Sequence, residues 1–275
     1  MVEGHASRRL HSALHALQML IAAFAFLGPV LFMLSSGFKP SDLVTALPPV
    51  MVFRPTLENY AAVMAAVPFL RFTMNSIVIA GGATLLGMTL AVPAAFAVSW
   101  NRMAWPAVLM LMTRMAPGGL FLLPWFVMFS SIDAIGDYWV LIVTHAAITL
   151  PLALWTMLPF FDALPRSLVE AAMIDGCSDL ALLRLVVLPL VTPGLAVSVV
   201  LCFVFAWNYF LFSLVLSDIG TRTLIVAAFN FVGEGATDWG ALMAAATLIA
   251  APPVVLAFLA QRHLISGLTS GAVKG

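Results

Sequence analysis

The sequence predicts an all-α, polytopic integral membrane protein, and three observations lead to this fold class. Of the 275 residues, 63% are hydrophobic and only 9% are charged, whereas soluble domains carry about 25% charged residues. The mean hydropathy is +1.09. The apolar residues are gathered in six runs. Each run has about 20 residues or more, which is the length that an α-helix needs to cross the hydrocarbon core of a bilayer.

Six transmembrane helices are expected, in one membrane domain over residues 1–275. The predicted spans cover residues 13–34, 72–98, 105–130, 138–161, 194–216 and 241–262. The sequence lacks the alternating segments of about ten residues that a transmembrane barrel requires. The first run follows Arg8 and Arg9, as in a signal peptide, but its apolar stretch is too long for one and no A-x-A cleavage site follows. We therefore expect it to be a retained helix.

The basic residues predict which side of the membrane each loop occupies. An even number of spans places both termini on the same side. With the termini in the cytoplasm, seven arginine and lysine residues lie inside, four lie outside and one lies within a span. Basic residues are enriched in cytoplasmic loops. We therefore expect cytoplasmic termini, a large cytoplasmic loop over residues 162–193 and a cytoplasmic tail over residues 263–275.

Several classes of protein are excluded by what the sequence lacks. The formal net charge is zero, which gives no basis for nucleic-acid binding. Cys177 and Cys202 form neither a disulfide framework nor a metal-ligand spacing. No P-loop is present, since neither Lys39 nor Lys274 lies in a G-x4-G-K-[ST] motif. The chain is therefore not an ATPase itself, and no cofactor or metal is expected to bind to it.

One polar segment interrupts the apolar sequence, at EAAMIDGCSDLALLRLVVLPL over residues 170–190. Pro165 suits the first turn of a helix, and Gly176 suits the position after its end, where φ is positive. Ser178 suits the N-cap of a second helix, with Asp179 in its first turn. The segment is therefore predicted to be a helix, a bend and a second helix. It either docks another protein or rests on the bilayer as an amphipathic loop.

The same segment resembles the EAA loop of permease subunits of bacterial ABC importers. The shared spacing is E-A-A-x3-G-x9-V-x-L-P, with Val186 where the family usually has isoleucine. Three further stretches are similar to the carbohydrate branch of that family, the MalG-like permeases. They are IDG at 174–176, FAWNYFL at 205–211 and GLTSGAVKG at 267–275. We call residues 162–193 the EAA loop from here on.

This resemblance implies a fold, a function and a set of partners. The fold is that of type I ABC importers, also called MetI-like. The chain is then a non-catalytic permease subunit in the bacterial inner membrane that forms half of the pathway for a carbohydrate. The implied partners are a second related permease, a dimer of ATPase subunits that binds ATP and Mg²⁺, an extracytoplasmic solute-binding protein, and the lipid bilayer. The binding protein is expected to dock on the outer loops 35–70 and 217–240.

Two groups of residues are implied to contact the ATPase. In the EAA loop, a coupling helix carries the contact and a bend sets its direction; the residues are Glu170, Ala171, Ala172, Asp175, Gly176, Leu188 and Pro189. The C-terminal tail resembles one that reaches between two ATPase subunits; its residues are Gly267, Ser270, Gly271 and Lys274. A short rigid helix that moves as a body would rock the attached spans and so alternate access to the pathway.

Arg114 is the one formally charged residue deep within a predicted span. With a rise of 1.5 Å per residue from Trp105, it lies about 13 Å into the membrane. A buried charge at this depth costs at least about 2.5–3.5 kcal/mol on insertion scales, so it is expected to face a partner or a wet cavity. It either donates to sugar hydroxyls or gates the pathway, or it holds carbonyl groups that are freed by Pro117.

The other candidate pathway residues are polar or aromatic side chains within the spans. Asn75 opens the second span, and Trp207 and Asn208 lie deep in the fifth. An aromatic face and a planar amide suit sugar recognition, but a gate or packing role is the favoured interpretation because the AWN stretch resembles a motif found across the family. His145 is expected to bond to a carbonyl one helical turn away. The small residues Ala83, Gly87, Ala91 and Ala95 predict close helix contact, either inside the chain or with a second subunit.

Two other functions compete with this interpretation. An ion-coupled secondary sugar transporter needs acidic residues inside its spans, and no Asp or Glu falls inside any predicted span. A membrane enzyme needs clustered catalytic side chains near one face, and the histidines and acids are scattered.

Overall fold

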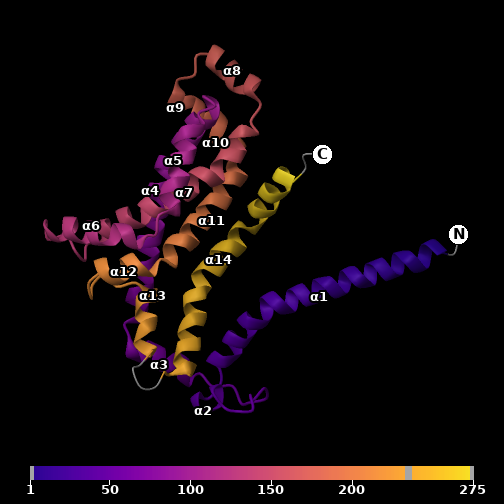
Figure 1. The fold of residues 1–275 in the computed structure, drawn as a ribbon, viewed down its shortest axis with the longest axis vertical. Coiled ribbons are helices and arrows are strands. Elements are labelled where there is room, and N and C mark those ends of the chain that lie inside the picture. The colour runs from indigo at the N-terminus through magenta and orange to yellow at the C-terminus, as the bar shows by residue number, and fades with distance from the viewer. Residues whose placement is uncertain (1–2, 233–236, 273–275) are drawn as a thin grey trace. The chain divides into compact units, whose positions relative to one another are not determined.

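The structure is a computed structural model that describes residues 3–232 and 237–272. In that part of the chain every regular element is a helix (Figure 1), so the all-α prediction is confirmed. The chain divides into two compact units. The first comprises residues 1–68 with 228–249, and the second comprises residues 69–227 with 250–275.

Four helices are long and apolar enough to cross a membrane without a break. They are Leu14–Gly37 within α1 (Glu3–Gly37), α4 (Phe69–Trp100), α7 (Tyr138–Asp162) and Trp239–Gln261 within α14 (Trp239–Ala272). Two bent helix pairs pass the same test, which gives up to six spans if each pair is one span. The unbroken helices coincide with the predicted spans at residues 13–34, 72–98, 138–161 and 241–262.

The prediction of one continuous helix over residues 105–130 is wrong in one respect, because the chain forms two helices there with a break between them. The helices α5 (Ala104–Met115) and α6 (Gly119–Ser130) meet at a bend of 88°. Ala116 between them is extended, with φ −68° and ψ 130°. A residue before proline avoids the helical region because its backbone clashes with the proline ring. Pro117 therefore ends α5 at the point where the break occurs.

The single helix expected over residues 194–216 is also broken. The helix α11 (Thr192–Trp207) ends at Trp207 with Asn208 as its C-cap, and α12 (Phe210–Leu216) follows after the extended residue Tyr209. The Asn208 amide Nδ2 donates to the carbonyl of Val204 at 2.8 Å. Asparagine side chains compete in this way with the backbone for helical hydrogen bonds. At its other end, α11 meets the helical segment Asp179–Leu190 at a bend of 86°.

The centre of the second unit is a bundle of α4, α7 and α11, which pack side by side (Figure 1). The predicted stripe of small residues on α4 lies inside this bundle, where Ala83, Ala91 and Ala95 are fully buried. A Cβ atom on Gly87 would lie 3.1 Å from the Thr149 hydroxyl of α7. The close contact predicted from the stripe is therefore made within the chain, between α4 and α7.

A Gly87→Leu substitution is expected to destabilise this bundle. Overfilling a tight helix contact costs about 1–3 kcal/mol of the free energy of unfolding. The measurement is the thermal unfolding of the purified chain in detergent. Gly81→Leu on the same helix is the matched control, because no atom lies within 4 Å of a Cβ built at Gly81. Equal losses for the two variants would contradict the packing assigned to the stripe.

The first unit contains α1, α2 (Ser41–Val44), α3 (Glu58–Ala66), the 3₁₀ helix η2 (Ala228–Phe231) and the first turns of α14. Its polar centre is Asn59, which is 2% exposed. The Asn59 Nδ2 donates to the carbonyls of Gly37 at 3.0 Å and Lys39 at 2.7 Å, and the Ser41 hydroxyl donates to its Oδ1 at 2.9 Å. This amide therefore fastens α3 to the end of α1.

Candidate functional site: the EAA loop and a cavity that contains Arg114

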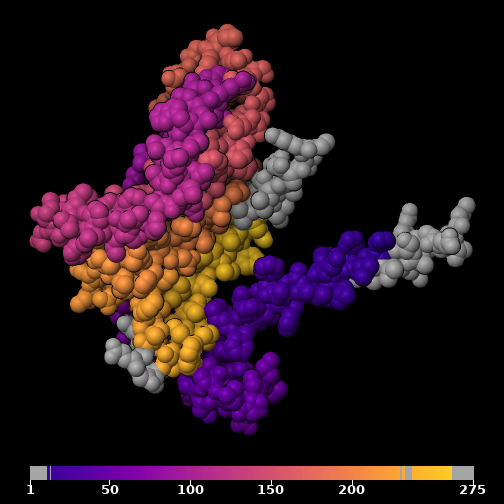
Figure 2. Space-filling model, viewed as in Figure 1, coloured from indigo at the N-terminus to yellow at the C-terminus, as the bar shows by residue number. Residues whose placement is uncertain are grey.

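The EAA loop folds as the predicted helix, bend and second helical segment. It contains α8 (Arg166–Ile174), α9 (Asp179–Ala181), a π-helix η1 (Leu182–Val187) and α10 (Leu188–Leu190). Pro165 occupies the N-cap rather than the first turn of α8. Together these elements form the exposed tip of the second unit, shown in salmon in Figure 2.

The bend is set by Gly176, whose φ is +84° as predicted. The N–H of Gly176 donates to the carbonyl of Met173, and the N–H of Cys177 donates to the carbonyl of Ala172, both at 3.1 Å. This pair of bonds is the Schellman motif, which satisfies the last carbonyls of a helix. The Ser178 hydroxyl accepts from the N–H of Ala181 at 3.4 Å, which confirms its predicted cap role.

The inner side of the loop is anchored in the core of the bundle. Val169 and Leu182 are 1% exposed and Val187 is fully buried. All three belong to one cluster with Met157 and Phe161 at the end of α7. A close-packed apolar cluster transmits displacement because it has little free volume. Movement of α8 is therefore expected to carry the ends of the membrane helices with it.

The outer side of α8 offers an uncovered apolar surface beside an acid. Glu170, Ala171 and Ile174 share one face of the helix and are all exposed, with Ile174 at 86%. In the rest of the loop, Leu180 and Leu185 are 73% and 69% exposed. Among the other predicted contact residues, Asp175, Gly176 and Pro189 are exposed, whereas Ala172 and Leu188 are half-buried. In a membrane protein, exposed apolar surface of this kind is covered either by another protein or by lipid.

A second feature is a cavity of about 520 Å³ lined by α5, α6, α7 and α11. Most of its lining is apolar, and its charged group is Arg114. The guanidinium carbon of half-buried Arg114 lies 4.5 Å from the centroid of the Phe205 ring. Within the described residues it forms no ion pair and no hydrogen bond, so it does not hold the carbonyls near Pro117. A half-buried guanidinium over an aromatic ring in a cavity has N–H groups with which it can donate to a polar ligand.

Tyr209 is a cavity residue that the sequence reasoning missed. It lines the cavity with Arg114, and its hydroxyl lies 1.8 Å from the position that a Cβ atom on Gly118 would take. Glycine at the α5–α6 break therefore lets the Tyr209 side chain cross the start of α6. The available signal was its place in the stretch FAWNYFL, directly after Asn208.

The other predicted pathway residues are not among the described residues that line this cavity. Asn75 is buried; its Nδ2 donates to the carbonyls of Gly220 and Arg222, both at 2.9 Å, and its Oδ1 accepts from the Tyr138 hydroxyl at 2.6 Å. It therefore fastens the loop after α12 to α4.

Trp207 and Asn208 bound the break between α11 and α12. Trp207 is 3% exposed, and its ring stacks on Phe203 with the centroids 5.6 Å apart. Asn208 is exposed. Trp207 is therefore placed as a packing residue, and Asn208 as the residue that ends α11.

His145 makes the bond expected of it. Its Nδ1 lies 2.7 Å from the carbonyl oxygen of Leu141, one helical turn away, and its Nε2 lies 3.2 Å from the Ser213 hydroxyl. Both ring nitrogens are therefore engaged within the bundle.

The C-terminal residues that were predicted to contact the ATPase lie mostly outside the described part of the structure. Gly267, Ser270 and Gly271 belong to α14, but only their backbone lies within the described part. Lys274 lies outside the described residues altogether. Where the chain is described, no three His, Cys, Asp or Glu side chains are grouped so that they hold a metal ion.

The loop after α12 contains a carboxylate with a perturbed pKa. The Asp218 Oδ1 accepts from the N–H of Thr221 at 2.9 Å and from its hydroxyl at 3.1 Å. The bond from the Thr221 N–H is the main cause that lowers the pKa of Asp218 from its ordinary value. Hydrogen bonds to the charged form of a carboxyl group lower its pKa in this way.

This pKa predicts how the loop responds to acid. A group whose pKa is lower in the folded state stabilises the fold above its ordinary pKa, and the effect is lost as the pH falls through the folded pKa. We therefore expect hydrogen exchange at the Thr221 amide, corrected for intrinsic rates, to lose protection only below about pH 4. Asp218→Ala should remove this pH dependence, and Asp42→Ala should leave it unchanged. A pH dependence that survives in Asp218→Ala would contradict the assignment.

Several known proteins are similar to this chain, one in its fold and others in their sequence. A chain of a bacterial ABC transporter involved in the import of the acidic polysaccharide alginate superimposes with a TM-score of 0.74 at 20% identity, over 94% of this chain and 98% of that one. The trehalose/maltose transport system permease protein MalG of Thermococcus litoralis is 35% identical, over 93% of this chain and 94% of its own length. The trehalose transport system permease protein SugB of Mycobacterium tuberculosis is 34% identical, over 94% of this chain and 96% of its own length.

A family model covers most of the chain as well. Residues 43–270 match the model of the binding-protein-dependent transport system inner membrane component. The matched range includes the EAA loop and the Arg114 cavity. The chain therefore belongs to the family of binding-protein-dependent transport system inner membrane components.

Proposed function

We propose that this chain forms half of the translocation pathway of an ATP-driven importer for a carbohydrate, and that the EAA loop couples this pathway to a separate ATPase. The observation that carries the coupling role is the two-sided structure of α8. Val169 on its inner side is buried in the bundle core, whereas Ile174 on its outer side is 86% exposed. One side of α8 is thus packed into the membrane domain, and the other side is free to contact a second protein. Such a helix can transmit movement from one protein to the other.

The substrate class is inferred from the relatives. Permeases named for trehalose/maltose, trehalose and diacetylchitobiose transport are 30–35% identical to this chain. The Arg114 cavity offers a guanidinium group, the Tyr209 hydroxyl and aromatic faces. Hydroxyl groups of a sugar accept and donate such hydrogen bonds, and aromatic rings cover its C–H faces. We assign this cavity to the substrate pathway and Arg114 to a polar contact within it.

The partners follow from the same assignment. A second related permease completes the pathway, and two ATPase subunits bind ATP and Mg²⁺ and contact the EAA loop and the C-terminal tail. A solute-binding protein outside the membrane docks on the outer loops 35–70 and 217–240; a chain similar in fold was solved in a transporter complexed with a periplasmic protein that carries an alginate pentasaccharide. With both termini in the cytoplasm, the EAA loop faces the ATPase.

The experiment is reconstitution of this chain with its partner permease, ATPase and binding protein in liposomes. Uptake of a sugar bound by that binding protein is expected to require ATP and the binding protein. Family membership does not favour the alternative of an ion-coupled secondary transporter. Uptake that is driven by a proton or sodium gradient without ATP would overturn the proposal.

A further inference from the structure

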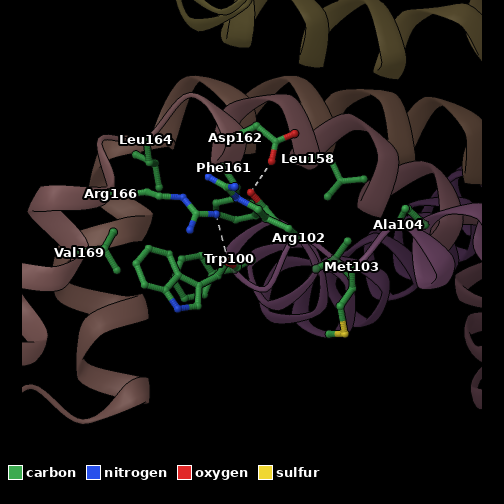
Figure 3. A pocket seen from close by; sticks show the side chains of 14 residues that line it. Trp100, Arg102, Met103, Ala104, Leu158, Phe161, Asp162, Leu164, Arg166 and Val169 are labelled. Atoms are coloured by element: carbon green, nitrogen blue, oxygen red, sulfur yellow. Dashed lines mark hydrogen bonds between the residues drawn. The ribbon is translucent and has the colours of Figure 1, made fainter.

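A second cavity, of about 550 Å³, lies at the end of the second unit that carries the EAA loop. Its walls come from the end of α4, the start of α5, the end of α7 and the start of α8 (Figure 3). The proposed function does not use it. Val169 of α8 forms part of its wall, so the cavity adjoins the helix that is proposed to contact the ATPase.

Two arginine side chains are directed into the same part of this cavity (Figure 3). Arg166 starts α8, and its Nη2 donates to the carbonyl of Trp100 at 3.2 Å. The guanidinium carbon of Arg166 lies 5.2 Å from the centroid of the Trp100 ring. Arg102 lies in the turn that follows α4. One guanidinium is thus fixed by a hydrogen bond and an aromatic face, and the second reaches the same space from a different element.

The acid in the wall does not neutralise these arginines. Asp162 accepts a hydrogen bond from the hydroxyl of Ser99. In the described part of the chain it forms no ion pair with Arg102 or Arg166. The described lining therefore carries two positive charges and one negative charge. Several N–H donors of the guanidinium groups remain available, and such donors match the oxygen atoms of a phosphate group.

Arg102 has a backbone conformation that is unusual for an arginine. Its φ is +54°, in the left-handed region that side chains other than those of glycine and asparagine rarely adopt. The N–H of Arg102 donates to the carbonyl of Ser99 at 3.2 Å, and the N–H of Met103 donates to that of Val98 at 3.0 Å. This pattern repeats the one at the end of α8, where Gly176 holds the equivalent position. An arginine stands here where the local backbone favours glycine, and its side chain is directed into the cavity.

We propose that this cavity binds the phosphate group of an anionic phospholipid at the cytoplasmic membrane surface. The two arginines explain why the cavity would bind a phosphate group. The exposed apolar surface of α5 beside it explains why that phosphate would belong to a lipid. Trp105, Leu109 and Met112 follow one face of α5 away from the cavity and are 67%, 48% and 61% exposed. Acyl chains cover such a surface, tryptophan prefers the interface, and basic pockets at the ends of membrane helices bind anionic headgroups. A bound lipid would brace the junction of α7 and α8, next to the anchor Val169.

The test compares lipid binding to the full-length chain and to an Arg102→Gly variant by native mass spectrometry in detergent. Wild-type chain is expected to retain dioleoylphosphatidylglycerol over dioleoylphosphatidylcholine. Arg102→Gly removes one charged donor and relieves the left-handed backbone, so the protein should remain folded. Loss of one charge-assisted contact to phosphate should weaken phosphatidylglycerol binding about tenfold.

Two further variants separate this site from general charge and from misfolding. Ala104→Trp fills the cavity without changing its charge and should also weaken phosphatidylglycerol binding. Arg54→Gln combined with Arg184→Gln removes two exposed arginines outside the cavity lining and should leave binding unchanged. The proposal is overturned if Arg102→Gly and Ala104→Trp retain the lipid, or if the control pair loses it equally. It is also overturned if inorganic phosphate at millimolar concentration displaces the lipid, because the site would then be one for free phosphate.

Discussion

Replacing Gly176 by proline is expected to abolish uptake while the importer still inserts and assembles. Proline fixes φ near −65°, whereas Gly176 has φ +84°. Proline also removes the N–H that bonds to the carbonyl of Met173. Together these changes cost about 3 kcal/mol or more in local free energy, which is enough to redirect α8. The buried anchors Val169 and Leu182 lie outside the bend, so the bundle itself should be retained.

The measurement is sugar uptake together with ATP hydrolysis in the reconstituted importer. Uptake should fall to background, and hydrolysis should no longer respond to the binding protein. Gly176→Ala is the graded control. No atom lies within 4 Å of a Cβ built at Gly176, so this variant should suffer only the left-handed strain, about 1–2 kcal/mol, and retain intermediate uptake. Normal uptake in the proline variant would rule out the coupling role of the bend.

Arg114→Ala is expected to reduce uptake about tenfold to a hundredfold without loss of the assembled complex. A hydrogen bond to a charged group contributes about 1.5–3 kcal/mol, and each 1.4 kcal/mol is a factor of ten. Because the guanidinium forms no ion pair and no hydrogen bond in the described part of the chain, little stability should depend on it. The Phe205 ring, 4.5 Å away, remains in place to line the cavity.

The readouts for Arg114 are uptake and the recovery of the assembled importer by size-exclusion chromatography. Arg114→Lys keeps the charge but not the planar donor group, and it should retain part of the activity. If Arg114→Ala prevented assembly, the residue would be structural and the assignment of the cavity to the pathway would lose its main support.

Local chemistry explains why the EAA loop was predictable from the sequence. Glycine at residue 176 and serine at residue 178 act through their own backbone bonds to neighbours within a few residues. The same is true of Pro117, which marks the end of α5. The angle of 88° between α5 and α6 was not predictable, since a proline marks the end of one helix without fixing the direction of the next. The break at Asn208 was not predictable either, because no proline or glycine lies at this position.

The cavities were not predictable, because each is assembled from distant segments. Arg114 was singled out by its depth alone, but its contact with Phe205 depends on the packing of α5 against the bundle. Arg102 and Arg166 appear in the sequence as ordinary basic residues near membrane surfaces. Only the fold brings them to the same cavity, where Arg166 of α8 contacts Trp100 at the end of α4. Conversely, Asn75 has the chemistry of a ligand contact, and the fold instead uses it to hold a loop.

The measurement that tests the coupling of this chain to a separate ATPase most directly is photo-cross-linking from α8. A benzophenone amino acid is introduced at Ile174, on the exposed side of the helix, in cells that express the complete importer. The matched control is the same amino acid at Ile219, which is 74% exposed in the loop after α12. We predict that position 174 cross-links to a protein that contains a P-loop and that position 219 does not. A chain that cross-links at position 174 to lipid alone would contradict the account.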